Sequence, residues 1–149
     1  MYGRYFEELD VGKIYVHGIH KTITESDNNL FCLLTMNHHP LHLDEEYAKH
    51  TTYQGKVVVG TLIISLVVGM SVGDISGKAI ANMGFSNIKH EYPVYIGDTI
   101  EAITRIMDKR ISRTKAYCGI VSVMTRAYNQ NGTRVLIMHR DILIPLKNR

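Results

Sequence analysis

The segment from Gly60 to Val72 reads GTLIISLVVGMSV and is apolar on nearly all sides. It is longer than a typical strand, so a central helix explains it better than an amphipathic surface helix does. Small residues recur every four positions, at Ser65, Gly69 and Gly73, and would let a sheet or a partner approach closely. Because β-branched residues are plentiful, two buried strands remain the rival interpretation. We favour the helix.

The residues around this segment predict strands. An opening strand is expected within residues 14–24, and four more within residues 79–90, 99–110, 116–128 and 134–144. Asn131 and Gly132 are typical of a two-residue hairpin between the last two strands. Strands in meander order after one buried helix predict an α+β fold, in which a curved antiparallel sheet wraps around a long central helix.

The region before the central helix predicts two more helices with a loop between them. Thr24 and Asp27 have the spacing of a capping box, and a helix of about three turns should follow and end near Met36. Pro40 disfavours α conformation in the residue before it, so residues 37–42 are expected to form a structured loop. Asp44 is then expected to cap a short helix, although it could instead pair with a histidine.

Composition indicates one ordinary globular domain spanning residues 1–149. Hydrophobic residues make up 45% and charged residues 21% of the chain. The net charge of +3 comes from dispersed Lys and Arg, which argues against nucleic-acid binding and suits an anionic small ligand. The longest uncharged run, residues 57–73, is interrupted by three glycines and is short for a membrane span, so no membrane partner is expected.

Cysteine usage and the N-terminus predict a cytoplasmic protein. Cys32 and Cys118 are far apart and lack CxxC spacing, and the first residues contain no apolar stretch of signal-peptide type. Two reduced thiols are therefore expected.

Polar residues gather most densely in the segment 37–44, where His38, His39 and His42 stand within five residues. Pro40 is expected to prevent the helical i, i+4 arrangement in which two histidines bind one metal ion, and no Cys lies nearby at a spacing typical of metal sites. No metal is therefore expected. One alternative is a set of solvated loop histidines. Other basic residues could meet an anionic ligand, but a solvated face is their default role: Lys89, His90, Lys109, Arg110, Arg113 and Lys115.

The segment NHHPLHLD at residues 37–44, followed by Glu46, Tyr47 and Ala48 and then by VVGTL at residues 58–62, resembles the signature of the MaoC-like hydratases. These are R-specific enoyl-CoA hydratases and dehydratases of the hot-dog fold. The resemblance implies a single hot-dog domain that works as a homodimer and hydrates an enoyl-CoA reversibly. Coenzyme A would enter as part of the thioester substrate, and no separate cofactor is expected.

The same resemblance implies roles for individual residues. His42 would activate the water, and a backbone N–H at Gly60 would bind the thioester oxygen. Both roles agree with general chemistry, since an unperturbed histidine titrates near neutrality and a helix N-terminus offers free N–H groups where negative charge develops. Gly60 could also be needed only for packing. Substrate contacts are expected from Pro40, Val59 and Thr61.

Asn37 departs from the family pattern, in which this position is Asp. An amide cannot give or take a proton near neutral pH. Asn37 could orient the water while His42 handles both proton transfers, or the chain could belong to the branch that resembles mesaconyl-CoA hydratases and methylmalyl-CoA dehydratases, where Asn would be normal. A third possibility is a degenerate site that binds acyl-CoA without turnover. Val59 also departs, because many of these hydratases have His there.

Two other functions compete with hydration. An acyl-CoA thioesterase of the same fold would commonly use a carboxylate near the central helix, and residues 57–73 contain none. A non-catalytic acyl-CoA binding module is the other alternative, and Asn37 is the residue that favours it most.

Overall fold

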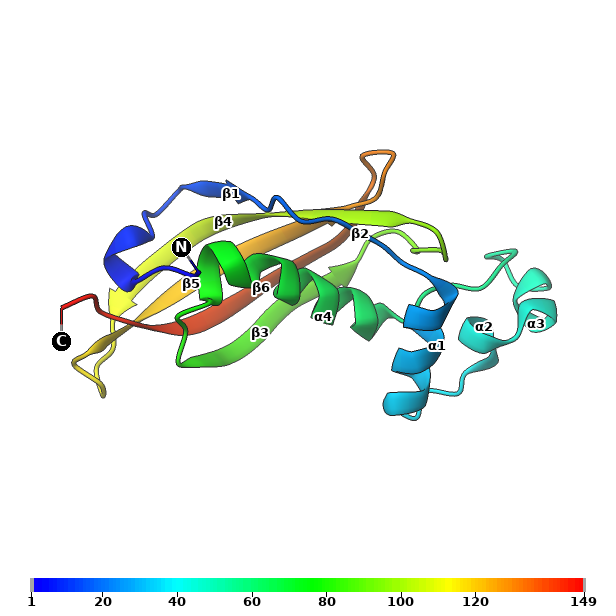
Figure 1. The fold of residues 1–149 in the computed structure, drawn as a ribbon, viewed down its shortest axis with the longest axis horizontal. Helices are drawn as coiled ribbons and strands as arrows, with labels where there is room; N and C mark the ends of the chain where they lie inside the picture. Colours follow the sequence, from blue (N-terminus) through cyan, green and yellow to red (C-terminus); the bar gives the residue numbers. More distant parts are fainter. Residues whose placement is uncertain (1, 149) are drawn as a thin grey trace.

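The computed structural model describes residues 2–148. A central helix, α4 (Gly60–Ser71), lies along one face of a curved antiparallel sheet (Figure 1). One further turn of π-helix, η2 (Val72–Ser76), continues it. The strands are β1 (Ile14–Val16), β2 (Lys21–Thr22), β3 (Ala81–His90), β4 (Thr99–Ile111), β5 (Cys118–Tyr128) and β6 (Arg134–Pro145). The predicted central helix and α+β class are confirmed.

The order of the strands differs from the predicted meander. The sheet runs β1-β4-β5-β6-β3, so β3 pairs with β6 at one edge and does not pair with β4, while β2 pairs with β4. The connection between β3 and β4 spans residues 91–98, which is longer than the usual loop of a β-hairpin. That length lets the chain cross the end of the sheet and place β3 on the far edge.

Helix α4 is covered by the sheet on one side only. Ile63, Val67 and Met70 are buried against the sheet, whereas Thr61, Ser65 and Gly69 on the other side are exposed. The core beneath the helix comes from facing strands and from the approach to α4: Ile23, Val58, Val94, Ile100, Ala102, Ala127, Val135, Leu136 and Met138. The helix is therefore buried on the side that faces the sheet, and its opposite side is exposed in the single chain.

The predicted opening strand is split. Residues 17–20 separate β1 from β2, and the His17 side chain turns into the core. His17 Nδ1 lies 2.8 Å from Asp74 Oδ2, and its Nε2 lies 2.7 Å from Thr104 Oγ1. These contacts join the opening segment, the end of the central helix and β4, so the chain bends where a regular strand was expected.

The hairpin between β5 and β6 has a three-residue loop, so the predicted two-residue turn is wrong. Asn129 N donates to Thr133 O, which closes the loop, and Gly132 N donates to Asn129 O. Gly132 has φ of 72°, the left-handed conformation that a three-residue hairpin requires at its last loop position. Asn131 and Gly132 thus mark the hairpin correctly but lie one residue later in the turn than predicted.

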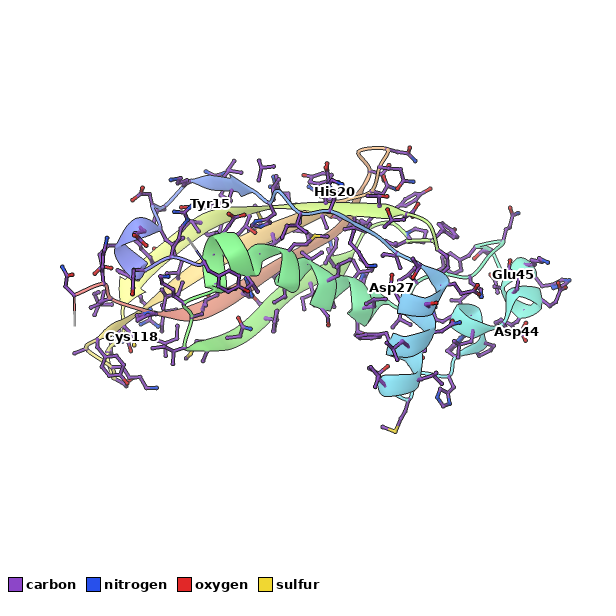
Figure 2. The ribbon with its side chains drawn as sticks, viewed as in Figure 1. Tyr15, His20, Asp27, Asp44, Glu45 and Cys118 are labelled. Atoms are coloured by element: carbon purple, nitrogen blue, oxygen red, sulfur yellow. The ribbon has the colours of Figure 1, made fainter. Side chains whose placement is uncertain are left out.

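Three helices form a unit beyond one end of the sheet: α1 (Glu25–Leu34), α2 (Pro40–Leu43) and α3 (Glu45–Lys49) (Figure 1). Asp27, Asp44 and Glu45 lie at this end, far from Cys118 (Figure 2). The capping box at the start of α1 is confirmed, because Thr24 and Asp27 exchange side-chain and backbone hydrogen bonds. Asp44 caps α3 by accepting from Tyr47 N at 3.0 Å, as predicted.

We expect Asp27→Asn to destabilise the protein by about 1 kcal/mol at neutral pH, because it removes the negative charge that interacts with Lys21 and with the positive N-terminal end of α1. Lys21, 2.7 Å away, and the Thr24 N–H lower the pKa of Asp27 to about 2. The carboxylate therefore contributes its full stabilisation of the folded protein above the ordinary pKa of Asp, 3.8, and loses it as the pH falls through about 2. Urea unfolding should show a difference from wild type that shrinks below about pH 4. Asp10→Asn is the control, and a pH-independent difference would contradict this account.

Candidate active site

A cleft of about 290 Å³ opens where α2, the start of α4 and the end of β3 meet. Its walls combine two histidines, a carboxylate and a mainly apolar floor. The lining residues are Leu41, His42, Tyr53, Val57, Val58, Gly60, Ile63, His90, Glu91, Tyr92, Pro93 and Val94. Two of the three predicted catalytic residues, His42 and Gly60, therefore meet in one cleft.

His42 lies on α2, a single helical turn where the sequence predicted a loop. Pro40 occupies the first position of this turn, where its missing N–H is tolerated, and His39 Nδ1 caps it by accepting from Leu41 N at 3.0 Å. Pro disfavours helical conformation in the residue before it, but it is favourable at the first position of a helix. The predicted loop is therefore wrong for residues 40–42, which form a helical turn. The short turn holds the His42 side chain toward the cleft.

The hydrogen bonds of His42 define its tautomer. Nδ1 lies 2.6 Å from Val57 O, and a carbonyl can only accept, so Nδ1 carries the proton. Within residues 2–148, Nε2 of His42 has no hydrogen-bond partner. With the proton on Nδ1, the neutral tautomer has its unshared electron pair on Nε2, which is the form that a general base requires.

Asn28 of α1 joins the two parts of the site and was not among the predicted site residues. Its side chain is fully buried; Nδ2 donates to His42 O at 3.0 Å, and Oδ1 accepts from Val59 N at 3.0 Å. One amide thus connects the turn that carries His42 to the residue that precedes α4. No local sequence pattern marks this role, because the partners of Asn28 lie 14 and 31 positions away along the chain.

The start of α4 offers backbone donors to the cleft. Val59 is the N-cap residue and has no side chain that could cap the helix. The first N–H groups of a helix lack intrahelical partners, and its dipole makes this end partly positive. A methyl group on Gly60 would lie 2.8 Å from His90 Nε2, so a larger residue would fit here only if the His90 ring moved.

The other predicted site residues lie around the cleft but do not line it. Asn37 is half-buried, and its Oδ1 accepts weakly from His39 N at 3.4 Å. Pro40 starts α2, Val59 is buried behind the cleft wall, and Thr61 is exposed on α4. The predicted contacts of Asn37, Pro40, Val59 and Thr61 with substrate therefore remain predictions.

Glu91 brings a carboxylate into the cleft from outside the central helix. It forms a two-point ion pair with Arg134, in which Arg134 Nη2 lies 3.0 Å from Oε1 and Nε also contacts Oε2. The hydrogen bond from Arg134 lowers the pKa of Glu91. A carboxylate held in this way is a weak base, so Glu91 is poorly suited to the role that a thioesterase would need.

Within residues 2–148, no three His, Cys, Asp or Glu side chains are arranged to hold a metal ion. His38 is exposed, and His39 serves as the cap of α2. The same described part of the chain contains no helix that is both long and apolar enough to cross a membrane.

Comparison with known proteins identifies the family. Residues 8–128 match the family described as "MaoC like domain". The chain belongs to the MaoC-like family. A conserved hypothetical protein of Mycobacterium tuberculosis, described as having a double hotdog fold, has a similar structure, with a TM-score of 0.89 and 18% identity. The match covers 98% of this chain and 45% of that protein. The chain has the same hot-dog fold.

Two curated relatives are named as hydratases. Mesaconyl-CoA hydratase of Cereibacter sphaeroides is 30% identical over 95% of this chain and 41% of its own length. The (R)-specific enoyl-CoA hydratase of Rhodospirillum rubrum is 34% identical over 68% of this chain and 69% of its own. This MaoC-like chain thus spans less than half of the first relative and about two thirds of the second.

Proposed function

We propose that the protein is an enoyl-CoA hydratase that adds water reversibly across the double bond of an enoyl-CoA. The observation that carries this proposal is the His42 tautomer, with Nδ1 committed to Val57 O and Nε2 free in a cleft that also contains the start of α4. Membership of a family that includes named hydratases supports the reaction class.

In the proposed reaction, His42 Nε2 takes a proton from water as the water oxygen bonds to the β carbon. The electron pair of the double bond moves toward the thioester oxygen, where the Gly60 N–H stabilises the resulting enolate charge. His42 then returns its proton to the α carbon on the same face, which completes a syn addition. Dehydration follows the same path in reverse.

Asn37 has a supporting role in this proposal. Its amide cannot exchange a proton near neutral pH, so it would orient the attacking water through its oxygen while His42 performs both transfers. Asn37 stands at the base of the turn that carries His42, three residues before Pro40.

We further propose that two copies of the chain associate through β3. All ten residues of β3 are exposed in the single chain, and they include the apolar residues Met83, Phe85 and Ile88. β3 is the terminal strand of the sheet, so one edge of its backbone is unpaired within the described residues. An exposed apolar edge of this length favours pairing with an identical strand.

We expect Phe85→Lys to convert the dimer into single chains, because a charge on an edge strand opposes edge-to-edge pairing. Phe85 is 45% exposed to solvent in the single chain, so its replacement should leave the fold of the chain largely intact. Sedimentation equilibrium should give twice 16.9 kDa for wild type and for the control Phe85→Met, and the single-chain mass for Phe85→Lys. A monomeric wild type, or a dimeric Phe85→Lys protein, would contradict the proposal.

The hydratase proposal is tested by incubating the purified protein with crotonyl-CoA and with mesaconyl-CoA. Enoyl thioester absorbance and free thiol are followed together. Loss of absorbance without thiol release supports hydration. Thiol release would instead identify a thioesterase, and measurable binding without either change would identify a non-catalytic acyl-CoA binding module.

A further inference from the structure

His90 is the second histidine of the cleft, and it lies directly against the start of α4. It ends β3, where it pairs with Leu136 of β6. A methyl group placed on Gly60 would lie 2.8 Å from His90 Nε2 and 3.0 Å from Cε1. The imidazole therefore packs on the Gly60 backbone at the point where the proposed reaction develops negative charge.

The geometry points to His90 as a second hydrogen-bond donor to the thioester oxygen, through Nε2–H and beside the Gly60 N–H. This inference rests on the proposed hydratase function and adds a catalytic residue to it. Nε2 and the Gly60 nitrogen lie within about 5 Å of each other, given the 2.8 Å separation above and standard bond lengths. One oxygen can accept hydrogen bonds of about 2.9 Å from two donors at that separation.

The state of His90 suits a donor. Within residues 2–148 its ring has no hydrogen-bond partner, so the ring is available to a ligand. The neighbouring Glu91 is engaged by Arg134 and is not paired with His90. Although His90 is exposed as a residue, partial desolvation of its ring against the start of α4 lowers its pKa. The lower pKa keeps the ring neutral near pH 7, and a neutral imidazole still has one N–H to donate.

The chemistry gives His90 a reason to act here. The hydration step places most of its developing charge on the thioester oxygen, and Asn37 cannot supply the proton that an Asp would share. A second neutral donor stabilises the enolate without needing any proton transfer of its own. Glycine at residue 60 lets the His90 ring lie directly against the helix backbone.

The test combines kinetics with a spectroscopic measurement. His90→Phe keeps a flat ring but has no hydrogen-bond donor. It should lower kcat for crotonyl-CoA hydration about 10²-fold, the lower end of the effect of removing one oxyanion donor, because the Gly60 N–H remains. His90→Gln retains a neutral N–H and should recover much of that loss. His20→Phe, an exposed histidine outside the cleft, is the matched control and should behave like wild type.

The carbonyl stretch of bound crotonyl-CoA provides a readout that needs no turnover. In His42→Ala the bound thioester should show a lowered stretching frequency, and the added His90→Phe change should return it part of the way to the free value. The inference would be overturned if His90→Phe kept the wild-type kcat and left the carbonyl stretch of His42→Ala unchanged when added to it. Equal losses of kcat in His90→Phe and His90→Gln would also overturn it. Absence of hydration by wild type would refute the proposed function instead, while the band would still report on His90.

Discussion

Replacing His42 by Ala is expected to lower kcat for enoyl-CoA hydration by about 10⁴-fold, the upper end of what a general base contributes. The effect should be this large because both proton transfers depend on Nε2 when Asn37 cannot share them. Binding of crotonyl-CoA should change little, since His42 forms one side of a wide cleft. Initial rates and calorimetric binding separate the two quantities.

His38→Ala is the matched control for this prediction. His38 belongs to the same histidine cluster but is exposed and has no hydrogen-bond partner within the described residues. It should retain the wild-type rate. Equal rates for His42→Ala and wild type would remove His42 from the mechanism, and equal losses in both variants would indicate damage to the loop rather than loss of a base.

Asn28→Ala is expected to destabilise the protein by about 3 kcal/mol. The change leaves His42 O and Val59 N without partners, and an unsatisfied buried polar group costs about 1–3 kcal/mol. Activity should also fall, because the amide sets the position of the His42 turn relative to the start of α4. Urea unfolding monitored by circular dichroism measures the first effect, and initial rates at a temperature where the variant is folded measure the second.

The neighbouring Asn29 provides the control for Asn28. Asn29 Oδ1 is buried without a hydrogen-bond partner, so Asn29→Ala removes an unsatisfied group and substitutes a better helix former in the same helix. We expect Asn29→Ala to be neutral or stabilising. A loss in Asn29→Ala as large as in Asn28→Ala would mean that α1 tolerates no truncation and that the bridging hydrogen bonds are not responsible.

The sequence was informative where local patterns determine structure. The apolar run at residues 60–72 and the capping box at Thr24 and Asp27 lead directly to α4 and α1. The order of the strands could not be predicted in the same way. β3 and β4 are consecutive in sequence, but β5 and β6 lie between them in the sheet. Pairing across a sheet depends on long-range packing, which periodicity does not encode.

The site residues also differ in how well the sequence predicts them. His42 and Gly60 could be predicted because a motif surrounds them, and both line the cleft. Asn28 and His90 could not be predicted, since each contributes only through a contact with a residue about 14 or 30 positions away. His90 was expected on a solvated face; the residue is exposed, and its ring also lies against Gly60. Asn37 carries the motif's most notable departure, yet it stands outside the cleft lining.

The most direct test of the central claim is a product analysis after incubation of the wild-type protein with crotonyl-CoA in ¹⁸O-labelled water. The hydratase account predicts an intact coenzyme A thioester that has gained one molecule of water, with the ¹⁸O at the β carbon. In deuterium oxide, one deuterium should also appear at the α carbon on the same face. Recovery of unchanged crotonyl-CoA, or of free coenzyme A with ¹⁸O in the released acid, would contradict the account.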